Sequence, residues 1–247
     1  MIPLHAFRSD ILKNRIPGKL MFLKMAGSHS YNLSTPESDV DFFGVYAAKT
    51  NSVLGLCPPP ATITGEKPDF TIHEVGKFCL LLLKGNPTIV EALFTERFTI
   101  SEMDAWTYLT TIRDKFLSRR VVRQYLGYCQ GQIHKLAAHG GTGGLHTAGG
   151  KYSSKWAYHI IRLAWQARDI AMGREPRPWM EGGERDILMK IRAGEWSQQQ
   201  VEDTARLIIS GIDLKKPWPL PDEGNDVLLN AWLLNVREAM WEPRNRV

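Results

Sequence analysis

The stretch Ala26–Tyr46 constrains the fold of this chain more than any other, because two apolar runs enclose a short polar turn. The runs Met21–Ala26 and Phe42–Ala48 each have the length and composition of a buried strand. The turn between them opens with Gly27-Ser28, which predicts backbone N–H groups and a hydroxyl that can bind an anion, followed by a short helix over about His29–Leu33. The sequence therefore predicts two strands joined through an anion-binding turn.

Two carboxylates precede the apolar part of the second predicted strand. Asp39 and Asp41 are two residues apart, so the alternation of side chains along a strand predicts that both lie on the same side of the sheet. Two like charges at this spacing repel each other unless a cation lies between them. Mg²⁺ suits such a pair, because it is usually held by one or two carboxylates and by the phosphates of its substrate. For either motif alone, an ordinary loop or turn is the alternative interpretation.

These motifs, in this order along the chain, resemble the motifs of a known protein superfamily. Gly27-Ser28, Ser38-Asp39-Val40-Asp41 and Gly44-Val45 are similar to the signature of the nucleotidyltransferase superfamily related to DNA polymerase beta. With Tyr31 and Thr35 included, the chain most resembles the YcgL/RlaP type of nucleotidyltransferase, some of which are associated with RNA repair. The resemblance implies an α+β fold, in which a polymerase-beta-like palm with a mixed sheet is followed by an all-helical C-terminal domain. It also implies transfer of a nucleoside monophosphate from an NTP to an acceptor hydroxyl, with release of pyrophosphate.

The same resemblance implies a third metal-binding carboxylate on a neighbouring strand. Asp69 begins an alternating segment, residues 69–73, which is predicted to form a strand, and we assign the role to Asp69. Glu66 and Glu74 are the alternatives, and Glu74 is more typical of a charge at a helix N-terminus.

A predicted helix over residues 151–172 carries one narrow polar stripe on an otherwise apolar surface. Lys155, His159 and Arg162 recur at intervals of four and three residues, and they match the family's Lys-x-x-x-His-x-x-Arg-Leu helix. Because a surface helix normally has a wide solvated face, we expect these cations to face a cleft, and the imidazole to titrate near neutrality. A salt-bridged surface stripe is the alternative.

The resemblance gives each predicted site residue a role. The predicted catalytic residues, which are also the ligands of two Mg²⁺ or Mn²⁺ ions, are Asp39, Asp41 and Asp69. The predicted nucleotide-binding residues are Gly27, Ser28, Lys155, His159 and Arg162. We expect Asn86, in a Lys-Gly-Asn-Pro-Thr corner, to cap a helix, although a place near the cleft is an alternative.

Helical periodicity dominates the rest of the chain. The other segments predicted to be helical are 5–15, 74–83, 101–116, 119–138, 183–193, 197–211 and 225–240. The helix 119–138 has a basic face, which is either solvated or binds RNA. The glycines of His139–Gly150 predict a loop that is disordered without ligand. We therefore predict a catalytic domain over 1–110 and a helical domain over 111–247.

The charge and the composition of the chain limit the classes of partner that it can be expected to bind. A net charge of +5 and a pI near 9.1 fit a polyanionic partner such as a nucleotide or RNA. The resemblance implies that the substrates are an NTP and an RNA or tRNA end. The 3 cysteines share no metal-ligand spacing, and no run has the length of a membrane helix, which indicates a cytoplasmic protein without a membrane partner. A toxin-like enzyme that nucleotidylates a protein, and a non-catalytic nucleic-acid-binding protein, are the alternatives. The acceptor, the base preference and the oligomeric state stay open.

Overall fold

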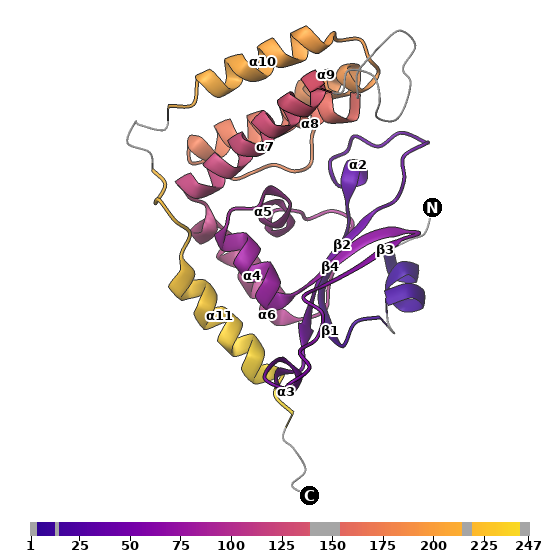
Figure 1. Cartoon of the computed structure of the whole chain (residues 1–247), viewed down its shortest axis with the longest axis vertical. Coiled ribbons are helices and arrows are strands. Elements are labelled where there is room, and N and C mark those ends of the chain that lie inside the picture. Colours follow the sequence, from indigo (N-terminus) through magenta and orange to yellow (C-terminus); the bar gives the residue numbers. More distant parts are fainter. Residues whose placement is uncertain (1–3, 13–14, 139–153, 214–218, 243–247) are drawn as a thin grey trace, which may run out of the picture. The chain divides into compact units, whose positions relative to one another are not determined.

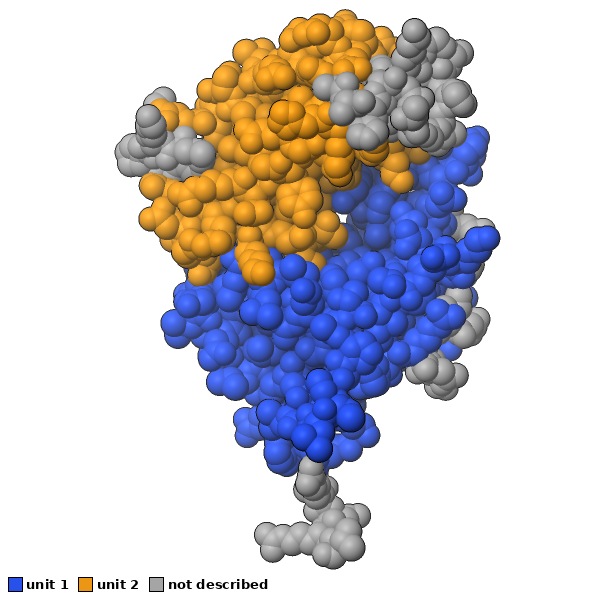
Figure 2. Space-filling model, in the orientation of Figure 1, with its two compact units in different colours: residues 1–83, 92–116, 225–247 blue, residues 84–91, 117–224 orange. Residues whose placement is uncertain are grey.

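The computed structural model of the 247-residue chain describes residues 4–12, 15–138, 154–213 and 219–242. The chain separates into two compact units, which Figure 2 shows in blue and orange. Unit 1 comprises residues 1–83, 92–116 and 225–247, and unit 2 comprises residues 84–91 and 117–224. The loop predicted over His139–Gly150 lies outside the described residues.

A five-stranded mixed sheet forms the centre of unit 1 (Figure 1). Its strands are β1 (Gly18–Met25), β2 (Phe42–Ala48), β3 (Thr62–Glu66), β4 (Asp69–Glu74) and β5 (Thr99–Ser101). They lie in the order β3-β4-β2-β1-β5; β2 and β4 are parallel, and the other neighbouring pairs are antiparallel. The sequence predicted β1, β2 and β4. It missed β3, which has no fully buried residue, and β5, which has three residues.

Unit 1 also contains several helical segments. They are α1 (Leu4–Ala6), a π-helical turn (Phe7–Leu12), α2 (Gly27–Ser30), α3 (Thr50–Val53), α4 (Val75–Leu83), α6 (Asp104–Thr111), a 3₁₀ turn (Arg113–Phe116) and α11 (Asp226–Ala239). The prediction of one helix over 101–116 is wrong at its start, because Ser101 pairs with β1 and a helix begins only at Asp104. The predicted helix over 5–15 is likewise divided into α1 and the π-helical turn.

Aromatic pairs fix both faces of the sheet. On one face, the ring of Phe7 stacks on that of Phe42 in β2, with centroids 3.9 Å apart. On the opposite face, Phe22 of β1 stacks on Trp106 of α6 at 4.2 Å, and Phe78 of α4 packs against the same indole at 5.2 Å. Such pairs contribute about 0.5–1.5 kcal/mol each beyond the area they bury. Helical segments of unit 1 therefore pack on both faces of the sheet.

The C-terminal helix packs in unit 1. Arg237 of α11 donates to both carboxylate oxygens of Glu74, at 2.6 and 2.9 Å, and the indole N–H of Trp232 donates to the carbonyl of Ala105 at 2.8 Å. The sequence predicted a single domain boundary between residues 110 and 111, with α11 in the second domain. In the structure α11 belongs to unit 1, because it returns to α4 and α6 after more than a hundred residues in unit 2. Periodicity alone shows that α11 is a helix but does not show which elements it meets.

Unit 2 is helical. Its helices are α7 (Arg119–Ala138), α8 (Ser154–Ala171), α9 (Gly182–Arg192) and α10 (Gln198–Ser210), and α5 (Pro87–Leu93) begins in it and ends in unit 1. The helix α8 packs against α7, α9 and α10. Ser197 caps α10 through a reciprocal capping box with Gln200. The mixed sheet and the helical region after it confirm the predicted α+β class.

Candidate active site

The Gly-Ser turn and the second carboxylate lie in direct contact. Beyond the last pair of β1 and β2, the N–H of Ala26 donates to the carbonyl of Asp41 at 2.7 Å. The next residue, Gly27, has a φ of +60°, which favours glycine over residues with a side chain. A Cβ atom at Gly27 would lie 2.5 Å from Oδ2 of Asp41, so the bare glycine leaves room for that carboxylate. The fold thus joins the two halves of the sequence motif.

The turn after Gly27 is anchored by buried side chains. α2 covers residues 27–30, whereas the sequence predicted a helix over about 29–33. The carbonyl of Ser28 accepts from the N–H groups of Tyr31 and Leu33, at 3.3 and 3.0 Å, and both of those side chains are buried. Gly27 and Ser28 themselves keep partial exposure. A ligand can therefore reach the Gly-Ser pair while its neighbours hold the turn in place.

Asp39 and Asp41 come before β2 and not within it. A turn positions them, in which the hydroxyl of Ser38 accepts from the N–H of Thr35 at 2.8 Å and the Ser38 N–H donates to the Thr35 carbonyl at 3.0 Å. Asp39 is exposed, and Asp41 is half-buried. The sequence predicted that both carboxylates lie within a strand, where alternation would place them on one side. This prediction is wrong, because β2 begins at Phe42.

Strand register brings Asp69 next to Asp41. Phe42 of β2 pairs with Phe70 of β4 in parallel, so the residues before them, Asp41 and Asp69, occupy equivalent places at the same end of two neighbouring strands. Asp69 is exposed. Glu66 is the cross-strand partner of Asp69 on β3 and is also exposed. Glu74, by contrast, is at the other end of β4 and is buried against Arg237.

These carboxylates suit a hard divalent cation, because oxygen ligands are what Mg²⁺ prefers. Asp39 and Asp69 are exposed, and Asp41 borders a turn that ligands can reach. Within the described residues, no group of three or more His, Cys, Asp or Glu side chains is close enough to hold a metal ion. The predicted assignment of Asp39, Asp41 and Asp69 as ligands therefore stays a prediction, supported by the chemistry of the donors and by strand register.

Sequence reasoning overlooked a buried lysine in the sheet. Lys24 of β1 pairs with Phe43 of β2, and 2% of it is exposed. Its ammonium group donates to the hydroxyl of Thr95 at 3.1 Å. The signal was present in the sequence, because a lysine in the middle of an apolar strand must find polar partners inside the protein.

The predicted stripe of α8 runs from the surface into the interior of unit 2. Lys155 is exposed and His159 partly exposed, whereas Arg162 and its ion-pair partner Glu91 are both 1% exposed, with 2.6 Å between nitrogen and oxygen. Burial and the nearby charges of Arg162 and Lys155 lower the pKa of His159 to about 3. This contradicts the expectation that His159 titrates near neutrality.

Further along α8 the stripe is occupied by internal contacts. The side-chain amide of Gln166 donates to the carbonyl of Arg177 and accepts from its N–H, both at 2.7 Å. Asp169 is 1% exposed and accepts from three guanidinium groups. Those hydrogen bonds lower the pKa of the Asp169 carboxyl, although burial opposes them. The nucleotide-binding role predicted for Lys155, His159 and Arg162 stays a prediction for residues of unit 2.

Asn86 has the predicted capping role. Its side-chain oxygen accepts from the N–H of Ile89 at 3.3 Å at the start of α5, and its amide donates to the hydroxyl of Tyr128 at 3.2 Å. Both interactions lie within unit 2 and hold α5 against α7. They confirm that Asn86 caps a helix.

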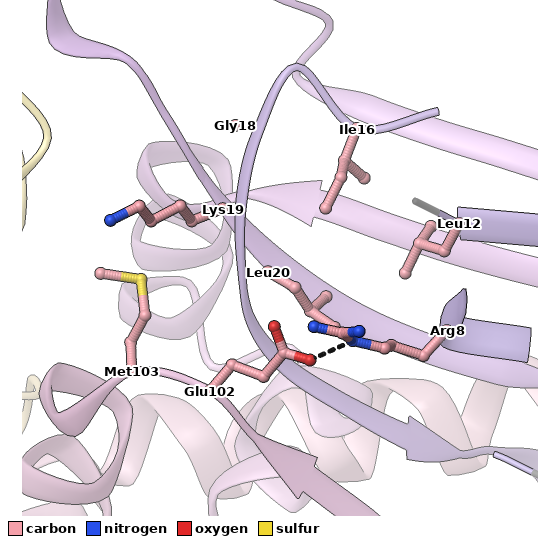
Figure 3. A pocket seen from close by; sticks show the side chains of 8 residues that line it. All are labelled: Arg8, Leu12, Ile16, Gly18, Lys19, Leu20, Glu102 and Met103. Carbon is pink, nitrogen blue, oxygen red and sulfur yellow. Dashed lines mark hydrogen bonds and ion pairs between the residues drawn. The ribbon is translucent and has the colours of Figure 1, made fainter. Parts of the chain in front are cut away.

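A pocket of about 270 Å³ lies elsewhere in unit 1, and Figure 3 shows the side chains that line it. They come from the π-helical turn, the start of β1 and the segment after β5, and they include an ion pair between Arg8 and Glu102. None of the eight predicted site residues lines this pocket. Among the described helices, none combines the length and the apolar composition needed to span a bilayer.

A relative from Enterobacteria phage T4, an uncharacterized 38.9 kDa protein in the nrdC-mobD intergenic region, is 28% identical over 127 residues. The similarity covers 46% of this chain and 38% of the relative, so the chain spans well under two thirds of that protein's length.

The family model described as RlaP, RNA repair pathway DNA polymerase beta family, matches residues 8–195. This match includes all five strands, the Gly-Ser turn and the α8 helix. Since it covers more than half of the chain, the chain belongs to the RNA repair pathway DNA polymerase beta family of nucleotidyltransferases.

Proposed function

We propose that this protein catalyses transfer of a nucleoside monophosphate from an NTP to a hydroxyl at an RNA or tRNA end. The acceptor oxygen attacks the α-phosphorus, the bond from that phosphorus to the bridging oxygen breaks, and pyrophosphate leaves. Membership of an RNA repair family supports the class of acceptor. The net charge of +5 is in keeping with two polyanionic substrates.

One observation carries the proposal: the contact between Gly27 and the carboxylate of Asp41. A Cβ atom at Gly27 would stand 2.5 Å from Oδ2 of Asp41, so a phosphate bound at the Gly-Ser turn would lie beside that carboxylate. A phosphate and a carboxylate in such proximity repel each other unless a divalent cation bridges them. The geometry therefore favours a nucleotide bound together with Mg²⁺.

In the proposed site each group of residues has a separate task. Asp39, Asp41 and Asp69 hold the cations, and Gly27 with Ser28 binds the β- and γ-phosphates through N–H groups and the hydroxyl. Two bound Mg²⁺ ions would lower the pKa of the acceptor hydroxyl and stabilise the entering and leaving oxygens. Lys155, His159 and Arg162 are proposed to bind the leaving phosphates. Of these three, Arg162 would have to leave or share its buried partner Glu91 to do so.

The test is a transfer assay with each labelled NTP, Mg²⁺ and either total RNA or a protein extract. Asp41→Asn keeps the shape of the side chain but removes a charge, so we expect turnover to fall by at least ~100-fold, as for the loss of a major electrostatic stabiliser. Asp39→Asn should behave in the same way. Glu37→Gln is the matched control, because Glu37 is an exposed carboxylate of the same loop without a proposed role.

The outcomes separate the alternatives. Labelled RNA that depends on Asp41 supports the proposal, and labelled protein would identify a protein-modifying enzyme instead. Near wild-type transfer by both Asn variants at saturating Mg²⁺ would show that these carboxylates are not the metal ligands.

A further inference from the structure

Three arginines at the start of α7 lie on its outer surface and face an acidic segment of the same unit. Arg120 donates to both carboxylate oxygens of Glu223, with 2.7 Å for one of the two bonds. Arg119 donates to Asp222 at 3.4 Å, and a guanidinium nitrogen of Arg123 lies 4.0 Å from the same carboxylate. Two acidic side chains thus occupy the arginine cluster of Arg119, Arg120 and Arg123.

These ion pairs are open to solvent and to competing anions. The side chains of the three arginines are 26–51% exposed, and those of Asp222 and Glu223 are 72% and 53% exposed. Exposed pairs contribute little to stability and are screened by salt. Charge-assisted bonds of this fork geometry form equally well with phosphate, so another anion can take the place of the two carboxylates.

Two glycines continue the same face of α7. Gly127 and Gly131 lie seven and eleven residues after Arg120, which places all three on one side of the helix. Both are exposed, and a Cβ atom at either would meet no atom within 4 Å. Glycine inside a helix destabilises it relative to alanine, and no neighbour in the described structure accounts for the missing side chains. Bare backbone at such a place allows the close approach of a partner from outside.

We propose that this surface, Arg119, Arg120, Arg123, Gly127 and Gly131, docks the sugar-phosphate backbone of the RNA acceptor, and that Asp222 and Glu223 occupy two phosphate positions in its absence. The proposal rests on the proposed function in taking RNA as the acceptor. The arginines bind phosphates, and the glycines let the RNA backbone lie close to α7. Tyr128, which is 44% exposed on the same helix, offers a ring on which a base can stack. Asp222 and Glu223 then compete with RNA phosphates for the arginines, so that ligands which bind weakly or lack phosphate do not displace them.

The first experiment measures binding of the full chain to a short labelled single-stranded RNA by fluorescence anisotropy, without NTP. Asp222→Asn with Glu223→Gln removes the competing charges, and we expect RNA to bind about tenfold more tightly, the scale of a few exposed ion pairs. Glu195→Gln with Asp203→Asn is the matched control, since it changes the net charge equally on α10 and the turn before it. The control should show only the small effect of net charge.

Two further variants test the arginines and the glycines separately. Replacing Arg119, Arg120 and Arg123 by Gln should reduce the slope of log affinity against log salt by about 2, since each phosphate contact on a single strand contributes about 0.7. Gly127→Gln with Gly131→Gln should raise the melting temperature, because glutamine is a better helix former, and yet weaken RNA binding. Weaker binding by a more stable protein cannot result from unfolding.

The proposal is overturned if the acidic-segment variant binds RNA no better than its charge control, if the glycine variant binds as the wild type does, or if the wild type binds no RNA at low salt. Because the binding assay contains no NTP, its result is independent of transfer. A chain that binds RNA at this surface and transfers no nucleotide would refute the proposed function alone.

Discussion

The carboxylate edge of unit 1, which is Asp39, Asp41 and Asp69, and the polar stripe of α8 in unit 2 are both groups of charged side chains, but they differ in burial. Asp39, in the turn before β2, and Asp69, at the start of β4, are exposed. In α8, Arg162 and Asp169 are each 1% exposed and are bound by other side chains of the same unit. Charged groups at an open edge can bind a ligand, whereas charged groups inside a helical unit must first satisfy one another. Regular spacing predicts a shared face but not what that face meets.

The largest expected effect concerns the buried pair of Arg162 and Glu91. Arg162→Ala leaves Glu91 buried without this partner, so we expect the free energy of unfolding to fall by about 3–5 kcal/mol, measured by urea denaturation. The double variant Arg162→Met, Glu91→Leu replaces both charges with apolar groups and should recover most of that loss. If Arg162→Ala kept wild-type stability and still lost nucleotide transfer, the contrast between the two regions would fail, and Arg162 would bind the triphosphate.

The next prediction tests the carboxylate edge at its third member. Asp69→Asn should lower the transfer rate by about 100-fold without changing the melting temperature, because an exposed carboxylate contributes little to stability but much to cation binding. The matched variant is Glu66→Gln, which changes the cross-strand neighbour of Asp69. A large loss of rate with Glu66→Gln and a small one with Asp69→Asn would move the third ligand to β3.

A smaller effect is expected from Gly27→Ala, for which the chain provides a close control. Gly27 and Gly182 have φ values of 60° and 58°, so alanine is strained by about 1–2 kcal/mol at either position. A Cβ atom at Gly182 would meet nothing within 4 Å, whereas at Gly27 it meets the carboxylate of Asp41. Both variants should lose similar stability, but only Gly27→Ala should lose transfer activity, by about tenfold or more. Equal activity of the two variants would remove the contact from the proposed site.

The last prediction concerns the pH dependence of stability at His159. Its pKa in the folded chain, about 3, lies below the unfolded value of about 6.5. Between these values the unfolded chain binds a proton that the folded chain does not bind. The contribution of neutral His159 is therefore present above pH 6.5 and is lost as the pH falls towards 3, by at most about 1.4 kcal/mol per pH unit.

Replacing the imidazole should flatten that dependence. His159→Gln is expected to reduce the loss of stability between pH 6 and 4, followed by denaturant unfolding at each pH. His134→Gln, at an exposed position on α7, is the control. Parallel curves for the wild type and His159→Gln would show that His159 is not responsible for the loss.

Much of the fold could be predicted from local patterns. The apolar run Phe42–Ala48 gave the bounds of β2, and the periodicity of Arg119–Ala138 gave those of α7, because burial on one or both faces leaves a direct trace in the sequence. The strand β3 left no such trace, since its residues are half-buried or exposed. For the site, the motif identified Gly27 and Asp41, but it did not show that the glycine is required by the carboxylate itself.

The sequence by itself determined the α+β class, the family and the order of the carboxylates, because strand and helix periods and a short motif are local properties of the chain. Only the tertiary structure decided that β2 and β4 are parallel neighbours with Phe42 opposite Phe70, that Arg162 is paired with Glu91, and that α11 returns to the sheet unit. Each of these depends on which distant segments pack together. Such pairings follow from the packing of the whole chain, where burying a charge is tolerated only if a partner is brought to it.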